Sequence, residues 1–96
     1  MTLEDMQRCA PKALALLKTM ANEKRLFILC NLTQGELSVN ELAEKIQLSQ
    51  SALSQHLAIL RQEGYVNTRK ESQTVFYSIR GEDTKQMLDL LQRLYG

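Results

Sequence analysis

Few residues of this sequence could carry covalent chemistry: Cys9, Cys30 and a single histidine, His56. Enzymes of the common group-transfer classes need a nucleophile beside a general base, or a glycine-rich loop that binds phosphate. The sequence contains neither pattern, and His56 falls on the flank of an apolar helix face, where it is expected to pack or to contact a phosphate. We therefore predict that the protein is not an enzyme and needs no cofactor.

Residues 49–63 are suited to a different chemistry, which is hydrogen bonding to the edges of bases. On a helical wheel of about 100° per residue, three leucines share one face. The opposite face is small, polar and uncharged, and it consists of Ser51, Ser54, Gln55, Ala58 and Gln62. A merely solvated face usually collects Lys and Glu, whereas Ser and Gln donate and accept hydrogen bonds and let a helix sit deep in a major groove. The alternative is an ordinary exposed helix that happens to be rich in Ser and Gln.

The candidate DNA contacts extend beyond this face. The N-terminal end of a recognition helix usually reaches the bases and also favours a nearby phosphate. Residues 61–80 have a local excess of two positive charges, which suits phosphates or an adjacent minor groove. The predicted DNA-binding residues are Ser38, Gln50, Ser51, Ser54, Gln55, His56, Arg61, Arg69, Lys70 and Gln73.

A helix-turn-helix over residues 38–64 would position these side chains. Ser38 stands three residues before Glu41, the spacing of a capping box, and opens a short helix. Ser49 can cap the next helix, and Gly64 ends it; the turn between the two lacks the glycine often found there. Residues 65–80, rich in β-branched and aromatic side chains around a polar tip at 71–73, predict a β-hairpin wing.

Helices are also predicted before and after this core. Over residues 3–20, apolar side chains recur at helical spacing behind Thr2, and Pro11 predicts either a kink near Arg8 or a start at Ala10. The helix over residues 23–33, capped by Asn22, is apolar on nearly every side and is therefore expected to be buried. The helix over residues 82–95 has an apolar stripe too wide for one small core, so one side is expected to meet a partner chain.

Length and composition restrict the class of protein. The chain has 96 residues, 44% hydrophobic and 24% charged, which indicates one ordered domain over residues 1–96 with a small core that oligomerisation would stabilise. Twelve Lys and Arg against eleven Asp and Glu leave a net charge of +1, so total charge alone does not indicate a nucleic-acid partner. The apolar runs fall short of the roughly 20 residues that span a membrane, and we expect a cytoplasmic protein with no membrane partner.

The order of these elements, with the segment ELSVNELAEKIQLSQSALSQHLAILRQEGYVNTRKESQTVFYSI, resembles the ArsR/SmtB family of winged-helix repressors. The segments LLKTMANEKRLFILCNL and LSQSALSQHLAILRQEG are most similar to the HlyU and BigR branch, whose regulators are tied to virulence genes or to sulfide and redox stress. The resemblance implies a mostly α-helical fold with a small β-hairpin wing. It also implies a homodimer formed by residues 1–20 and 82–96, which binds double-stranded DNA at an imperfect palindrome through Gln50, Ser51, Ser54 and Gln55.

The resemblance raises the question of metal sensing. Metal-sensing members have cysteines in the stretch that matches residues 36–42, where this sequence has Ser38 and Asn40 and no thiol. Zinc-sensing members have Asp and His on the last helix, where this chain has Asp83 and Asp89 without a histidine, a poor match for zinc. No metal is expected.

The resemblance also implies a thiol switch, from which this sequence departs. The branch pairs a cysteine matching Cys30 with one near the end of the last helix, where Gly96 stands. Cys30 could still be oxidised or persulfidated, or it could be an inert apolar residue whose pKa is raised by burial. If the first two helices form a hairpin around Ala21, Cys30 lies beside about Leu14, and Cys9 is roughly 7 Å further along the helix axis. A direct disulfide between Cys9 and Cys30 therefore needs the chain to fold back at Pro11.

The sequence therefore predicts a homodimeric regulator that binds DNA and either represses transcription or displaces a silencer. Thiol oxidation or persulfidation at Cys30 is the candidate switch of its DNA binding. The alternative is a winged-helix module that binds a protein partner and no DNA. A continuous positive strip across both recognition helices would favour DNA.

Overall fold

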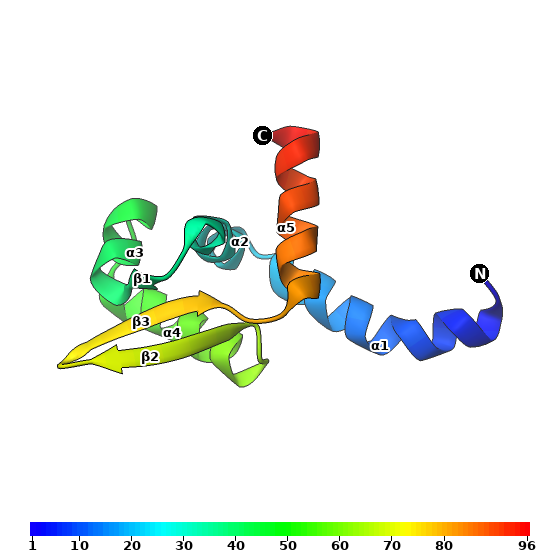
Figure 1. Ribbon diagram of the computed structural model, residues 1–96, viewed down its shortest axis with the longest axis horizontal. Coiled ribbons are helices and arrows are strands. Elements are labelled where there is room, and N and C mark those ends of the chain that lie inside the picture. Colours follow the sequence, from blue (N-terminus) through cyan, green and yellow to red (C-terminus); the bar gives the residue numbers. More distant parts are fainter.

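The computed structural model describes residues 1–96 and contains five α-helices, one 3-10 helix and a three-stranded antiparallel sheet (Figure 1). None of the helices combines the length and the apolar character needed to cross a membrane. The elements in chain order are α1 (Leu3–Met20), α2 (Glu23–Asn31), η1 (Leu32–Gln34), β1 (Leu37–Ser38), α3 (Val39–Ile46), α4 (Gln50–Gln62), β2 (Val66–Glu71), β3 (Thr74–Ile79) and α5 (Glu82–Tyr95).

Helix α1 extends away from the rest of the molecule, and its N-terminal half is free of other elements (Figure 1). The Thr2 hydroxyl accepts a hydrogen bond from the Asp5 amide, and the Asp5 carboxylate accepts one from the Thr2 amide. This capping box satisfies two amides of the first turn. The helix consequently begins at Leu3 and continues through Pro11, and a start at Ala10 is wrong.

The helix-turn-helix is formed by α3 and α4 as predicted. Ser38 and Glu41 make the reciprocal capping box that starts α3, and the Ser49 hydroxyl accepts a hydrogen bond from the Ala52 amide at the start of α4. The turn contains no glycine because Gln47 itself adopts the left-handed conformation, with φ at 61°. Its amide donates to the Ala43 carbonyl, which ends α3.

The wing is the hairpin β2–β3, and the sheet order is β1-β3-β2. The pairing of Glu71 with Thr74 leaves Ser72 and Gln73 as a two-residue turn. Ser72 has a positive φ of 56°, as the turns of tight hairpins require. Strand β1 was not predicted from the sequence. Its two residues pair with Tyr77 and Phe76 of β3, and so short a strand shows no alternation of polar and apolar side chains.

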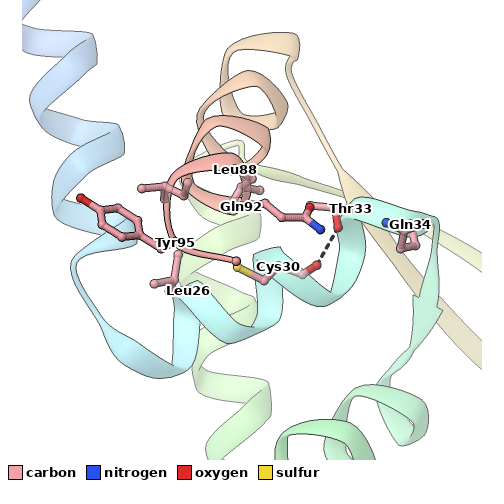
Figure 2. Close-up of a pocket in the computed structure, with 9 residues that line it drawn as sticks. Leu26, Cys30, Thr33, Gln34, Leu88, Gln92 and Tyr95 are labelled. Carbon is pink, nitrogen blue, oxygen red and sulfur yellow. Dashed lines mark hydrogen bonds between the residues drawn. The ribbon is translucent and has the colours of Figure 1, made fainter.

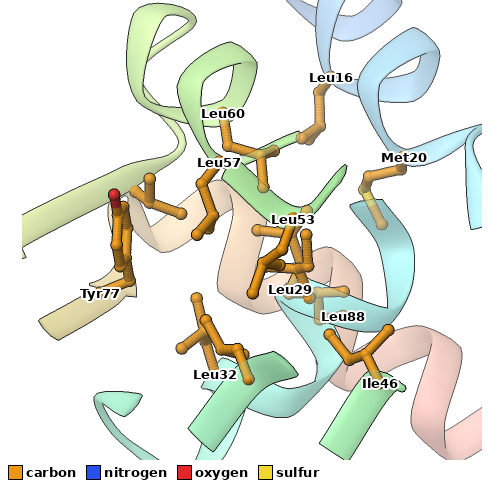
Figure 3. Close-up of a cluster of buried hydrophobic side chains, with 13 residues drawn as sticks. Leu16, Met20, Leu29, Leu32, Ile46, Leu53, Leu57, Leu60, Tyr77 and Leu88 are labelled. Atoms are coloured by element: carbon orange, nitrogen blue, oxygen red, sulfur yellow. The ribbon is translucent and has the colours of Figure 1, made fainter. Parts of the chain in front are cut away.

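The core lies between the helix-turn-helix, α2, α5 and the sheet (Figure 3). The predicted inward face of α4 is confirmed, since its three leucines are buried. The thirteen buried hydrophobic residues are Leu16, Met20, Ile28, Leu29, Leu32, Leu42, Ile46, Leu53, Leu57, Leu60, Val66, Tyr77 and Leu88.

Helix α2 is buried on one side only, so the expectation that it would be buried all round is wrong. Ile28 and Leu29 have no exposed surface, whereas Phe27 and Cys30 are exposed. The physical reason is that this small domain does not have enough elements to surround a helix completely.

Candidate nucleic-acid interface

The outward face of α4 has the character predicted from the sequence. Every residue assigned to it is exposed, and none is charged: Ser51, Ser54, Gln55, Ala58 and Gln62. The buried leucines on the opposite side fix the rotation of the helix about its axis. The face therefore presents hydroxyl and amide groups to solvent in a defined orientation, and these groups can donate to and accept from base edges.

The N-terminal end of α4 is tied to the N-terminal end of α3 through side chains. Gln50 is the first residue of α4 and Asn40 the second residue of α3, and both are exposed. The Gln50 amide nitrogen Nε2 donates to the Asn40 oxygen Oδ1 at 2.5 Å. Asn40 was not among the predicted DNA-binding residues, because its partner is ten residues away and on another helix.

Arg69 on β2 is bound by two carboxylates. Its guanidinium donates through Nε and Nη2 to both oxygens of Glu36, at 3.1 and 2.5 Å, and through Nη1 to Glu71 at 2.8 Å. The guanidinium also lies over the Phe76 ring, 4.7 Å from its centroid. These contacts hold the pKa of the Glu36 carboxyl below its usual value and raise the pKa of Arg69. Arg69 is therefore not the free cation that the sequence suggested.

The other predicted polar contacts of the wing and of α4 are accessible. Lys70 follows Arg69 in the strand and so points to the opposite face of the hairpin. Lys70 and Arg61 are exposed and form no ion pair, and Gln73 is exposed at the tip. Lys70 is thus the wing cation that is free to contact a phosphate.

Ser38 stands apart from the other predicted DNA contacts. Ser38 is only 7% exposed, and its hydroxyl accepts a hydrogen bond from the Glu41 amide at the start of α3. The Ser38 hydroxyl is thus engaged in capping α3. A DNA contact by Ser38 stays a prediction, which its burial does not favour.

His56 lies half-buried on α4, and its Nδ1 atom is buried without a hydrogen-bond partner. Burial lowers the pKa of the imidazole, and the positive charges of Arg25 and Lys24 on α2 lower it further. The lowered pKa favours the neutral form of the ring. Whether His56 packs or contacts a phosphate stays a prediction, and its half-buried position favours packing.

The two cysteines are both free and exposed. Cys30 lines a pocket of about 520 Å³ between α2 and α5, with apolar walls from Leu26, Leu88, Leu91 and Tyr95. Figure 2 shows its thiol pointing toward the C-terminal end of α5, where Gly96 lines the same pocket. Cys30 is not a core residue, although partial burial raises the pKa of its thiol.

The structure contains no group of three or more His, Cys, Asp and Glu side chains placed to hold a metal ion. Asp83 and Asp89 are both exposed on α5. That the protein senses no metal stays a prediction.

Comparison with known proteins places this geometry in a family. Residues 22–68 match the family model described as bacterial regulatory protein, arsR family. The chain is 59% identical over 95 residues to the transcriptional activator HlyU of Vibrio cholerae, covering 99% of this chain and 88% of that protein.

Two solved structures are similar over the whole chain. One is the transcriptional regulator HlyU from Vibrio vulnificus, with 59% identity, TM-score 0.93 and complete coverage of both chains. The other is the transcriptional repressor BigR from Xylella fastidiosa, with 38% identity, TM-score 0.92, and coverage of 100% of this chain and 98% of that one. These relatives are regulators of transcription, which confirms the prediction that the protein is not an enzyme. The chain belongs to the ArsR family of winged-helix transcriptional regulators, in the branch that contains HlyU and BigR.

Proposed function

We propose that the protein is a homodimer that binds a palindromic site in double-stranded DNA, with the two α4 helices in successive major grooves. The observation that carries this proposal is the exposed, uncharged Ser/Gln face of α4, held by the leucines buried behind it. The wing β2–β3 follows α4 directly, and the exposed side chains of Lys70 and Gln73 support additional contacts to flanking DNA.

Exposed apolar side chains on α1 and α5 support the dimer. A contiguous apolar surface on a small domain marks a site of association. The exposed large apolar residues of the two helices are Leu3, Met6, Leu14, Leu17, Leu90, Leu94 and Tyr95. A twofold dimer presents two recognition helices in inverted orientation, which is why the preferred DNA site is a palindrome with half-sites one helical turn apart.

The direction of regulation follows from what the bound dimer excludes from DNA. A dimer bound at a site that overlaps a promoter blocks polymerase and represses transcription. A dimer bound at the site of a silencing protein excludes that protein, and transcription rises. Both outcomes use the same DNA complex, and both place the protein with the chromosome in the cytoplasm.

Selection from a randomised duplex pool, followed by affinity measurements at several salt concentrations, tests the proposal. The wild-type protein should enrich a palindrome, and log K should fall linearly with log salt. Gln55→Ala should lose about 1–3 kcal/mol of discrimination at one base pair of each half-site. Gln62→Ala, on the same face but at the far end of the helix, is the matched control and should keep the wild-type preference.

A module that binds only a protein partner is the competing function. It predicts no enrichment of any sequence and no salt-dependent binding to duplex DNA. Such a result from a folded dimer would replace DNA binding with protein recognition through α1 and α5.

We further propose that Cys30 regulates DNA binding. The Cys30 thiolate would attack a low-molecular-weight persulfide or disulfide, with release of a thiol, and become a persulfide or mixed disulfide. The added atoms would occupy the pocket between α2 and α5, and α5 is one of the proposed dimer helices. Because the pKa of the thiol is raised, its rate of modification should increase with pH above neutrality. DNA affinity is to be measured under reducing, persulfide and peroxide conditions with Cys30→Ser as control, and identical curves would remove the switch.

A further inference from the structure

We propose that Asn40 orients the Gln50 amide so that this side chain reads an adenine in the major groove. The inference rests on the proposed DNA-binding function and adds to it a residue of α3 that itself lies outside the recognition helix. It is carried by the hydrogen bond between Gln50 Nε2 and Asn40 Oδ1, 2.5 Å long, at the adjoining N-terminal ends of the two helices.

The backbone around this pair is fixed on both sides. Asn40 lies in the first turn of α3, which the Ser38–Glu41 capping box holds. Gln50 is the first residue of α4, directly after its N-cap Ser49. Two capped helix starts therefore set the positions of both Cα atoms, and the hydrogen bond restricts the rotamers that the Gln50 side chain can adopt.

The hydrogen bond to Asn40 leaves some hydrogen-bonding groups of the Gln50 side chain free. A side-chain amide has two N–H donors and one carbonyl acceptor. Asn40 engages one donor, so one N–H and the oxygen Oε1 remain for a ligand. This donor and acceptor pair matches adenine, which presents N7 as an acceptor and the N6 amino group as a donor in the major groove.

Orientation before binding is what makes Asn40 a positioning residue. A free glutamine at an exposed helix end samples many rotamers and loses that freedom when it binds a base. With Asn40 in place, this loss occurs on folding rather than on DNA binding. The fixed amide presents its free donor and acceptor in one orientation, so a base that matches them gains relative to the other bases. Asn40 needs no contact with DNA to act in this way.

Selection from the randomised duplex pool, repeated with variants, tests this role. Gln50→Ala should lose the adenine preference at one base pair of each half-site, by about tenfold. Asn40→Ala should lose it at the same base pair, and the double variant should match Gln50→Ala alone. Asn40→Asp keeps the acceptor oxygen, so it should retain the adenine preference even though its charge weakens binding to all DNA.

Glu44→Ala is the control, because Glu44 is exposed on the same helix and makes no side-chain hydrogen bond; it should keep every base preference. Thermal unfolding of each variant separates positioning from a loss of fold, and Asn40→Ala should unfold at the wild-type temperature. A wild-type adenine preference in Asn40→Ala, or an equal loss at all positions, would overturn the inference while leaving DNA binding in place. Failure of the wild-type protein to enrich any sequence would overturn the proposed function, and the inference with it.

Discussion

Both carboxylate oxygens of Glu36 accept hydrogen bonds from the guanidinium of Arg69, which joins the residue before β1 to the middle of the wing across β3. Glu71 binds the same guanidinium from the wing itself. Two negative charges thus surround one positive charge on this face of the sheet. Lys70 is consequently the cation of the wing that has no carboxylate partner, and the two acidic side chains would oppose the approach of a phosphate to this face of the sheet.

Substitution Glu36→Gln should increase affinity for DNA of any sequence. It removes one negative charge and leaves Arg69 with a single carboxylate partner, so the guanidinium can contact a phosphate. One additional phosphate contact per protomer, and so two per dimer, should steepen the slope of log K against log salt by about 1.8, measured by fluorescence anisotropy on a duplex of arbitrary sequence.

The matched control for this charge change is Glu4→Gln at the start of α1, remote from the wing in Figure 1. It removes the same charge and should leave the salt slope unchanged. An equal increase in affinity in both variants would show that net charge, rather than the Arg69 contacts, sets the affinity.

His56 should make the protein less stable in mild acid. Its pKa is lowered in the folded protein by burial and by Arg25 and Lys24, so below 6.5 the unfolded chain binds more protons than the folded one. The contribution of His56 to the free energy of unfolding should therefore be fully present above this pH and fall as pH decreases through the window between 6.5 and the folded-state pKa. One group can contribute at most about 1.4 kcal/mol per pH unit.

Urea unfolding between about pH 7.5 and pH 5.5 measures this effect around the pKa of an unperturbed histidine. His56→Gln removes the titrating group and should flatten the profile. An unchanged slope in that variant would assign the acid sensitivity to other groups.

The parts of the fold that the sequence predicted are those defined by local chemistry. The caps Ser38 and Ser49 and the leucine spacing of α4 were sufficient to place the helix-turn-helix and its exposed face. Contacts between distant residues were missed, because nothing in the local sequence places Glu36 beside Arg69, 33 residues later. Gln47 was missed for another reason: its left-handed conformation is one that glycine favours, and only the surrounding turn imposes it on a glutamine.

Dimer formation should depend on Leu94, which is 61% exposed on α5. Burial of a leucine side chain contributes about 2 kcal/mol, and a twofold interface repeats the contact. Leu94→Glu should therefore raise the dimer dissociation constant at least about a hundredfold, as measured by analytical ultracentrifugation. Lys85→Ala makes the same change in net charge at an exposed position on the opposite side of the helix and should keep the wild-type constant, and equal constants for both variants would place the interface elsewhere.

A cysteine at position 96 should restore a two-thiol site. Gly96 and Cys30 line the same pocket, and a Cβ at residue 96 would come 2.7 Å from the Gln92 carbonyl oxygen, so the last residue must shift slightly. In a Cys9→Ser background, oxidised Gly96→Cys should lose two hydrogens by mass spectrometry and leave no alkylatable thiol, whereas the parent variant keeps Cys30 reactive. Full alkylation of both thiols after oxidation would mean that the end of α5 does not reach Cys30 in solution, and it would also weaken the case for regulation through this pocket.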